Sequence, residues 1–240
     1  MFFPDFSPVG SLKRALSGLV LHFGEGGSNA LPNEAAFLAT TISSHITGPA
    51  VKVYVSKSSL QTMRSVYSVL GDKVAVEPLL FHNSELDAEA ILSMMAVGSS
   101  DSAPLYMQII LVRCSSIFCR FIDPCQSILR DLGETFTFHT FLDQLELSKQ
   151  KFNPAQLSGL EQRMSLLTSF LEPKIKGKKT TTMKPRFAAG QLTIVDLSDP
   201  FIDSASACGI FQIITRLFTR AKVGTGKVLV VDEAHKVCCL

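Results

Sequence analysis

The residues of this chain that are best suited to chemistry, by type and spacing, are Asp-Glu-Ala-His at positions 232–235. They directly follow Val-Leu-Val-Val at 228–231, an aliphatic run without polar alternation. Such a run is typical of a strand buried on both faces of a parallel sheet, where ligand sites lie at the carboxyl ends of the strands. We therefore expect the two acids to lie at a ligand site; the alternative is that they only begin a loop or cap a helix.

Paired carboxylates at a strand end suit nucleotide hydrolysis. One acid holds a magnesium ion, directly or through water, and the next orients or deprotonates the attacking water. The order of the two residues assigns Asp232 to the magnesium ion and Glu233 to the water.

A second strand that ends in an acid precedes this one. Residues 190–198, Gly-Gln-Leu-Thr-Ile-Val-Asp-Leu-Ser, predict a strand that ends near Asp196, and an apolar helix at 205–220 follows with Asp203 as its N-cap candidate. Strand, helix and strand at this spacing make one right-handed crossover unit, which places both strands in the same parallel sheet. We therefore expect Asp196 to lie near Asp232.

The order of these motifs resembles the HerA/FtsK group of P-loop ATPases: a strand, Asp-Leu-Ser, a helix ending in Arg-Leu-Phe, a short loop, then Val-Leu-Val-Val-Asp-Glu-Ala-His-Lys. Segments in the middle of the chain are similar to the part that follows the second strand of that group, at residues 51–56, 76–79 and 84–87. The likeness covers roughly residues 50–111 and 127–236.

The resemblance implies an α/β fold, a RecA-like P-loop NTPase core with a mainly parallel sheet flanked by helices. It implies ATP and magnesium as cofactors, ATP hydrolysis as the activity, a homo-oligomer that is usually a hexameric ring, and nucleic acid or another polymer as the partner that is moved. By the same resemblance Glu233 is catalytic, Asp232 and Asp196 lie at the cofactor, and His235 couples the hydrolysis site to a substrate. For His235 the alternative is a polar residue at a helix start.

The phosphate-binding loop of that family, G-x-x-x-x-G-K-[ST], is absent from the sequence. Gly-Thr-Gly-Lys at 224–227 imitates its end, but Ala221 replaces the first glycine, Val228 replaces Ser or Thr, and a strand follows where a helix is needed. The glycine-rich run 24–28 has no lysine and holds an acid, so we interpret it as a turn before a helix. We expect this chain alone to be an inactive ATPase fragment; the alternatives are a non-catalytic interaction protein derived from such an ATPase, and a fragment of a DEAH-box helicase.

The domain organisation follows from the same comparison. The phosphate loop would precede the matched sequence and further strands would follow it, so we interpret residues 1–240 as a single incomplete P-loop NTPase domain, truncated at both ends. Five of the six cysteines fall in two short segments outside the likeness. We distinguish a leader, an insertion interpreted as translated intron sequence, a basic loop and a non-native tail, at residues 1–23, 112–126, 174–186 and 237–240. A genuine loop insertion and a natural tail are the alternatives.

Composition sets limits on the rest. The chain has 240 residues, of which 46% are hydrophobic, and a net charge of +2, so it can form one sizeable α/β core. Six cations and no acid occupy residues 174–186, which predicts a solvated loop; contact with a polyanion or an import signal are the alternatives. No stretch of about 20 uncharged apolar residues exists, so we predict no membrane span and an intracellular protein, cytoplasmic or nuclear.

Apolar periodicity and turn residues predict the elements of the chain. Strands are expected at 51–55, 74–76, 192–197 and 228–231. Besides the helix at 205–220, helices are expected at 34–44, 57–69, 84–96, 104–111, 127–132 and 154–171. This alternation favours a parallel sheet.

Overall fold

The computed structural model describes residues 5–6, 10–27, 30–43, 46–95, 137–148, 154–173 and 185–237. The insertion at 112–126, the helices expected at 104–111 and 127–132, and most of the basic loop and of the tail lie outside these residues. The strands are β1 (Asp5–Phe6), β2 (Gly10–Ser11), β3 (Ser17–His22), β4 (Ile42–Ser43), β5 (Ile46–Thr47), β6 (Ala50–Val55), β7 (Val74–Pro78), β8 (Gln191–Asp196) and β9 (Lys227–Val231). The helices are α1 (Leu60–Tyr67), α2 (Ala88–Met95), α5 (Phe138–Ser148), α6 (Pro154–Ser169) and α7 (Ser204–Arg220), with short 3-10 turns η1 (Glu34–Thr40), η2 (Ser68–Lys73), η3 (Asn83–Glu85) and η6 (Ala234–Val237).

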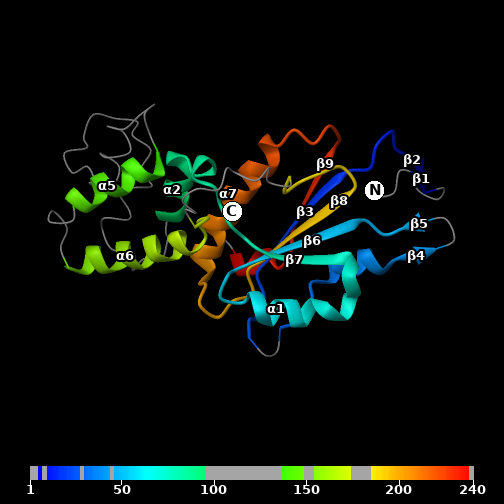
Figure 1. Cartoon of the computed structure of the whole chain (residues 1–240), viewed down its shortest axis with the longest axis horizontal. Coiled ribbons are helices and arrows are strands. Elements are labelled where there is room, and N and C mark those ends of the chain that lie inside the picture. Colours follow the sequence, from blue (N-terminus) through cyan, green and yellow to red (C-terminus); the bar gives the residue numbers. More distant parts are fainter. Residues whose placement is uncertain are drawn as a thin grey trace. The chain divides into compact units, whose positions relative to one another are not determined.

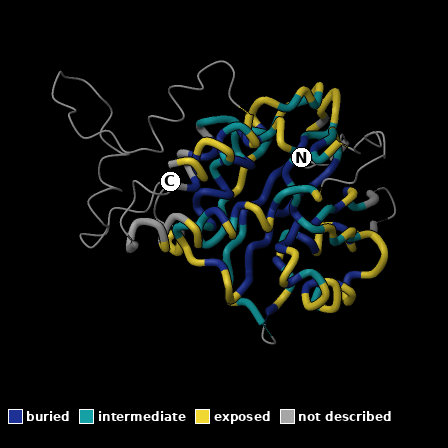
Figure 2. Tube along the Cα trace, turned by 60° about the vertical axis from the view of Figure 1, so that its left-hand side comes forward, coloured by how far each residue is buried: buried dark blue, intermediate teal, exposed yellow. Residues whose placement is uncertain are grey.

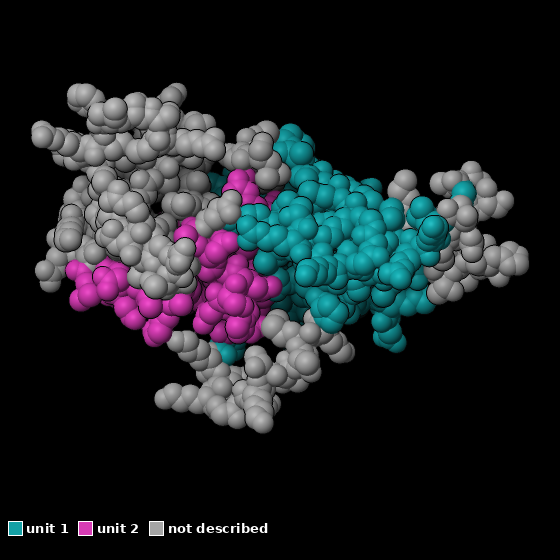
Figure 3. Space-filling view, turned by 90° about the horizontal axis from the view of Figure 1, so that it is seen from above, with its two compact units in different colours: residues 1–79, 173–207, 214–238 teal, residues 80–172, 208–213, 239–240 magenta. Residues whose placement is uncertain are grey.

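The chain forms two compact units, which Figure 3 colours separately. The first unit takes in residues 1–79, 173–207 and 214–238, and the second takes in 80–172, 208–213 and 239–240. The first unit contains the sheet and all the predicted site residues.

The sheet of the first unit has five strands in the order β7-β6-β8-β3-β9, and every neighbouring pair is parallel (Figure 1). Two short antiparallel pairs, β1 with β2 and β4 with β5, lie outside it. The predicted fold class is confirmed at this level, because the protein is an α/β fold with an all-parallel sheet and flanking helices. All four predicted strands are present in this sheet.

The strand β3 was not predicted. Its residues 17–22 were assigned to the leader, but they form a strand between β8 and β9, and Leu19 and Leu21 are fully buried. An apolar run of this length is compatible with a strand, a buried helix segment or the hydrophobic part of a leader, so periodicity alone could not assign it. Because β3 lies between β8 and β9, Asp196 and Asp232 lie on either side of it.

The strand β9 lies at one edge of the sheet, so the expectation that residues 228–231 are buried on both faces is wrong. Leu229 and Val230 are 42% and 46% exposed. By contrast, every residue of β8 is buried. The aliphatic character of a strand reflects its packing as much as its backbone, and the same run fits an edge or a central position.

The crossover between the two acid-bearing strands is confirmed in part. The strand β8, helix α7 and strand β9 follow one another and both strands belong to the same parallel sheet, but β3 lies between them. Asp203 caps α7 as expected, because its Oδ1 accepts a hydrogen bond of 2.9 Å from the Ser206 amide.

One buried apolar cluster of the first unit lies beside strands β6 and β8. Val53 and Ile194 of these strands belong to one buried cluster with Met63 and Tyr67 of α1 and Ala36 of η1. Figure 2 shows the buried strands in dark blue. This packing holds Tyr67 beneath the carboxyl ends of the strands.

The described residues of the second unit are mainly helical. The helix expected at 84–96 is divided into η3 and α2, because Asp87 accepts a hydrogen bond of 2.8 Å from the Ala90 amide and so caps a new helix. The helix α6 begins at Pro154 as predicted. An isolated parallel bridge joins Phe81 to Leu171, and the Phe81 and Phe170 rings are 6.4 Å apart.

Candidate functional site

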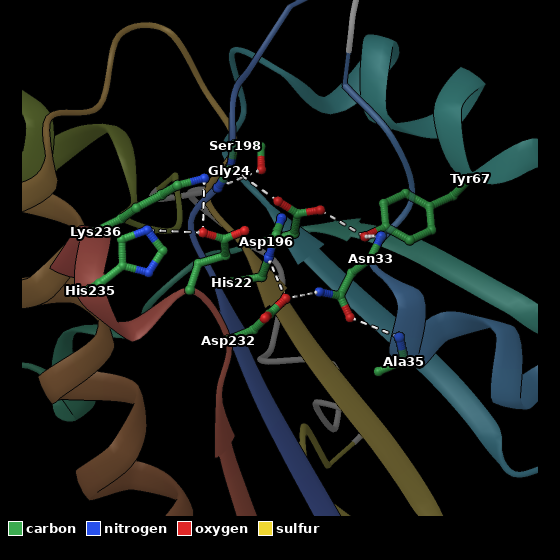
Figure 4. A network of polar contacts seen from close by, with 11 residues as sticks. His22, Gly24, Asn33, Ala35, Tyr67, Asp196, Ser198, Asp232, His235 and Lys236 are labelled. Atoms are coloured by element: carbon green, nitrogen blue, oxygen red, sulfur yellow. Dashed lines mark hydrogen bonds and ion pairs between the residues drawn. The ribbon is translucent and has the colours of Figure 1, made fainter.

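The carboxyl ends of β8, β3 and β9 bring three titratable side chains, Asp196, His22 and Asp232, to the same end of the sheet (Figure 4). In the register of the sheet His22 pairs with Asp196, and Leu21 pairs with Val231, the residue before Asp232. The Asp232 amide donates a hydrogen bond of 2.8 Å to the Leu21 carbonyl and extends this pairing. His22 therefore lies between the two acids that the sequence predicted to be close.

The carboxylate of Asp232 has two partners from the N-terminal part of the chain. Its Oδ2 accepts a hydrogen bond of 2.8 Å from Asn33 Nδ2 and lies 2.8 Å from His22 Nδ1. The Asp232 side chain is 44% exposed and that of His22 is 15% exposed. The predicted magnesium residue is thus accessible from solvent, but one of its oxygens is already used by the protein.

Asn33 connects the two acids. Its side chain donates to Asp232, its Oδ1 accepts a hydrogen bond of 3.0 Å from the Ala35 amide, and its own amide donates to the Tyr67 hydroxyl at 3.0 Å. The sequence predicted a helix that begins at residue 34, and Asn33 does cap η1. A capping residue can be recognised from the neighbouring sequence. The hydrogen bond from Asn33 to Asp232 could not be predicted in this way, because the two residues are 199 positions apart.

Asp196 is buried and its carboxylate is fully engaged. Its Oδ2 accepts a hydrogen bond of 2.7 Å from the Tyr67 hydroxyl, and its Oδ1 accepts one of 3.0 Å from the Ser198 amide. Burial, followed by the charge of Asp196, raises the pKa of Tyr67 far above its ordinary value, so the phenol stays neutral and remains a donor. Asp196 and Asp232 are therefore linked through Tyr67 and Asn33.

Glu233 belongs to a separate cluster. Its φ of +53° is the only positive φ of a non-glycine residue among the described residues, and this left-handed conformation is uncommon for glutamate. Its Oε2 lies 3.0 Å from Lys236 Nζ and 3.4 Å from His235 Nε2. The two residues predicted to act in catalysis, Glu233 and His235, are thus paired with each other, and His22 and Asn33 contact Asp232.

The loop after β3 packs against the loop after β8. The Gly24 amide donates a hydrogen bond of 3.1 Å to Ser198 Oγ, and a Cβ on Gly24 would lie 2.7 Å from His22 Nε2. A Cβ on Gly26 would lie 2.9 Å from the Asp199 amide nitrogen. Gly24 and Gly26 therefore allow a close approach between the two loops.

A hydroxyl cluster that was not predicted from the sequence lies at the end of β6. Asp199 is buried, and its Oδ2 accepts hydrogen bonds from the hydroxyls of Ser56 and Ser58. The amide of Phe201 donates a hydrogen bond of 2.8 Å to Asp199 Oδ1. These contacts join the end of β6 to the loop that follows β8.

The described residues of the loop after β3 make contacts within the protein. Gly24 and Gly26 approach Ser198 and Asp199, and the turn η1 that follows the loop begins with the acidic Glu34. Among the described residues no group of three or more His, Cys, Asp or Glu side chains could hold a metal ion. Asp232 could still contribute one oxygen to magnesium, which takes only one or two carboxylates when phosphates supply the rest.

Comparisons with known proteins add no match: no protein family, curated protein or solved structure corresponds to this chain. Of the helices that the structure describes, none has both the length and the apolar character needed to cross a bilayer.

Proposed function

We propose that this chain is a relative of the HerA/FtsK-type P-loop ATPases that has a RecA-like core but does not hydrolyse ATP by itself. The observation that carries the proposal is the meeting of Asp196, His22 and Asp232 at the carboxyl ends of three adjacent parallel strands, with Glu233 directly after Asp232. In open parallel sheets, ligands such as nucleotides usually bind at the carboxyl ends of the strands. The homo-oligomeric ring, the polymer partner and the intracellular location belong to the same proposal.

The contacts of the acids support the absence of hydrolysis. Both oxygens of Asp196 accept hydrogen bonds from the protein, and Glu233 is paired with Lys236. The sequence has no G-x-x-x-x-G-K-[ST] loop, whose backbone amides would hold a triphosphate. In this proposal the acids hold the strand ends together, which favours a non-catalytic interaction protein as the present role of the chain.

The test is phosphate release from Mg²⁺-ATP by the purified chain, compared with a Glu233→Gln variant. We expect both proteins to release phosphate at the same background rate, because neither completes a site. Circular dichroism of both proteins serves as the control for folding. Phosphate release that requires Glu233 would contradict the proposal and would show that a nucleotide reaches this edge.

A second measurement addresses nucleotide binding without turnover. A fluorescent ATP analogue is titrated with magnesium into the wild-type chain and into an Asp232→Asn variant. We expect weak binding that does not differ between the two proteins, because Asp232 Oδ2 is already bound by Asn33 and His22. Tight binding that is lost in Asp232→Asn would show a functional metal-nucleotide site.

A further inference from the structure

The outer side of β9 is an unpaired strand edge among the residues that the structure describes. There β9 is the last strand of the sheet and pairs only with β3 (Figure 1). Edge strands are usually protected from further pairing by charged side chains, proline or a bulge. The run Val-Leu-Val-Val at 228–231 contains no charge and no proline, and β9 pairs with β3 residue for residue, without a bulge. These four residues therefore carry none of the usual protections.

The backbone groups of β9 that face outwards follow from its hydrogen bonds to β3. The Gly226 carbonyl accepts a hydrogen bond of 3.0 Å from the Ser17 amide, and the Asp232 amide donates one of 2.8 Å to the Leu21 carbonyl. Successive residues of a strand direct their backbone groups to opposite sides, so the even-numbered residues from 226 to 232 face β3. The amides and carbonyls that face away from β3 are those of Lys227, Leu229 and Val231.

The side chains of β9 are incompletely covered on both faces of the sheet. Leu229 pairs in register with Leu19, and Val230 with Val20, and successive side chains point to opposite faces. Leu19 and Val20 are 0% and 4% exposed, whereas Leu229 and Val230 are 42% and 46% exposed. A partner helix would cover only one face, so a partner strand that continues the sheet is the element that fits this edge.

The charges that flank β9 favour an antiparallel partner of the same sequence. Lys222 precedes the strand and Lys227 begins it, whereas Asp232 and Glu233 follow its end. Lys236 offsets one of these two acids, so the start of the strand has net positive charge and its end has net negative charge. An antiparallel second copy places its acidic end beside the basic start, and a parallel partner of the same sequence would place like charges together.

We propose that two copies of this chain pair through β9 as antiparallel strands, about a two-fold axis at Leu229. In an antiparallel pair, opposite residues whose backbone groups face each other exchange two hydrogen bonds. Leu229 then lies opposite the same residue of the second copy, and Lys227 lies opposite Val231. This centre pairs all five residues of β9, and it joins the two five-stranded sheets into one.

This contact goes beyond the proposed function. A two-fold contact uses the same surface on both copies, whereas neighbours in a ring of more than two copies meet through two different surfaces. The contact involves the backbone and apolar side chains of an edge strand, and it requires no nucleotide.

The test is the mass of the full chain over a concentration series, measured by analytical ultracentrifugation. We expect a reversible equilibrium between one and two copies. Leu229→Lys places two lysines opposite each other at the axis, and Leu229→Glu places two glutamates there, so the dissociation constant of each variant should rise at least about tenfold. An equimolar mixture of the two variants should restore the dimer, because a lysine then lies opposite a glutamate.

The matched controls are Val69→Lys and Val69→Glu. Val69 is also an exposed aliphatic residue, and it lies in η2, outside β9. Neither control should change the dissociation constant. Circular dichroism of every variant serves as the control for folding.

Four results would overturn this proposal. The first is a wild-type chain that stays monomeric at every concentration. The second is a dimer that Leu229→Lys leaves intact or that Val69→Lys weakens equally. The third is an equimolar mixture of the Leu229 variants that stays monomeric. The fourth is an assembly of six copies that both Leu229 variants leave intact, which would support the ring of the proposed function and contradict the contact through β9.

Discussion

The hydroxyl of Tyr67 offers the sharpest test of the network at the strand ends. Replacing Tyr67 by Phe keeps the buried ring and removes only the oxygen that donates to Asp196 and accepts from the Asn33 amide. The loss of a hydrogen bond to a buried carboxylate costs about 2 kcal/mol, and the unpaired Asn33 amide adds about 1 kcal/mol. We therefore expect the free energy of unfolding to fall by about 3 kcal/mol near neutral pH.

The stability difference between the wild-type chain and Tyr67→Phe should become smaller as the pH rises above about 10. The pKa of Tyr67 is raised in the folded chain, so above about pH 10, the ordinary pKa of tyrosine, the unfolded state releases a proton that the folded state keeps. The stabilisation that comes from the raised pKa of Tyr67 is fully present below about pH 10 and falls by about 1.4 kcal/mol for each pH unit above it. Between about pH 9.5 and 11.5 the wild-type chain should lose about 2 kcal/mol relative to Tyr67→Phe, so the difference narrows from about 3 to about 1 kcal/mol.

Urea unfolding followed by far-ultraviolet circular dichroism measures both quantities, since the chain contains no tryptophan for fluorescence. Wild type and Tyr67→Phe are compared at each pH, so that the titration of other tyrosines and of lysines cancels. A difference that stays constant from neutral to alkaline pH would refute the buried neutral phenol. A difference below about 1 kcal/mol at neutral pH would refute its hydrogen bonds.

Two further substitutions test the loops around this network. Gly24→Ala places a Cβ 2.7 Å from His22 Nε2 and should cost about 1–3 kcal/mol by overpacking, whereas Gly27→Ala, with φ +93° and no atom within 4 Å, should cost only about 1 kcal/mol of backbone strain. Urea unfolding compares them, and equal losses would argue against the close approach of the two loops. Glu233→Asn should change stability by less than about 0.5 kcal/mol, because asparagine tolerates φ +53° and the half-exposed pair with Lys236 contributes little. Glu233→Val should lose about 1–2 kcal/mol in thermal unfolding, and equal stability of the two Glu233 variants would contradict the left-handed backbone.

Local sequence signals were sufficient to predict four of the five strands of the sheet. Four strands lie within two residues of their predicted bounds, and Asp203 caps α7, because apolar runs and capping residues act on their immediate neighbours. The same signals could not identify β3 as a strand or β9 as an edge strand. Both depend on which strands pair with them, and those partners lie far away along the chain.

The positions of Asp196 and Asp232 at strand ends could be predicted from local sequence, because an acid directly after an aliphatic run marks the point where a strand leaves the core. The contacts of these acids depend on the folded chain. Asp232 meets His22 and Asn33 across 210 and 199 residues, and Asp196 meets Tyr67 across 129 residues. A hydrogen bond depends on the distance between atoms in space, and the order of strands in the sheet sets that distance.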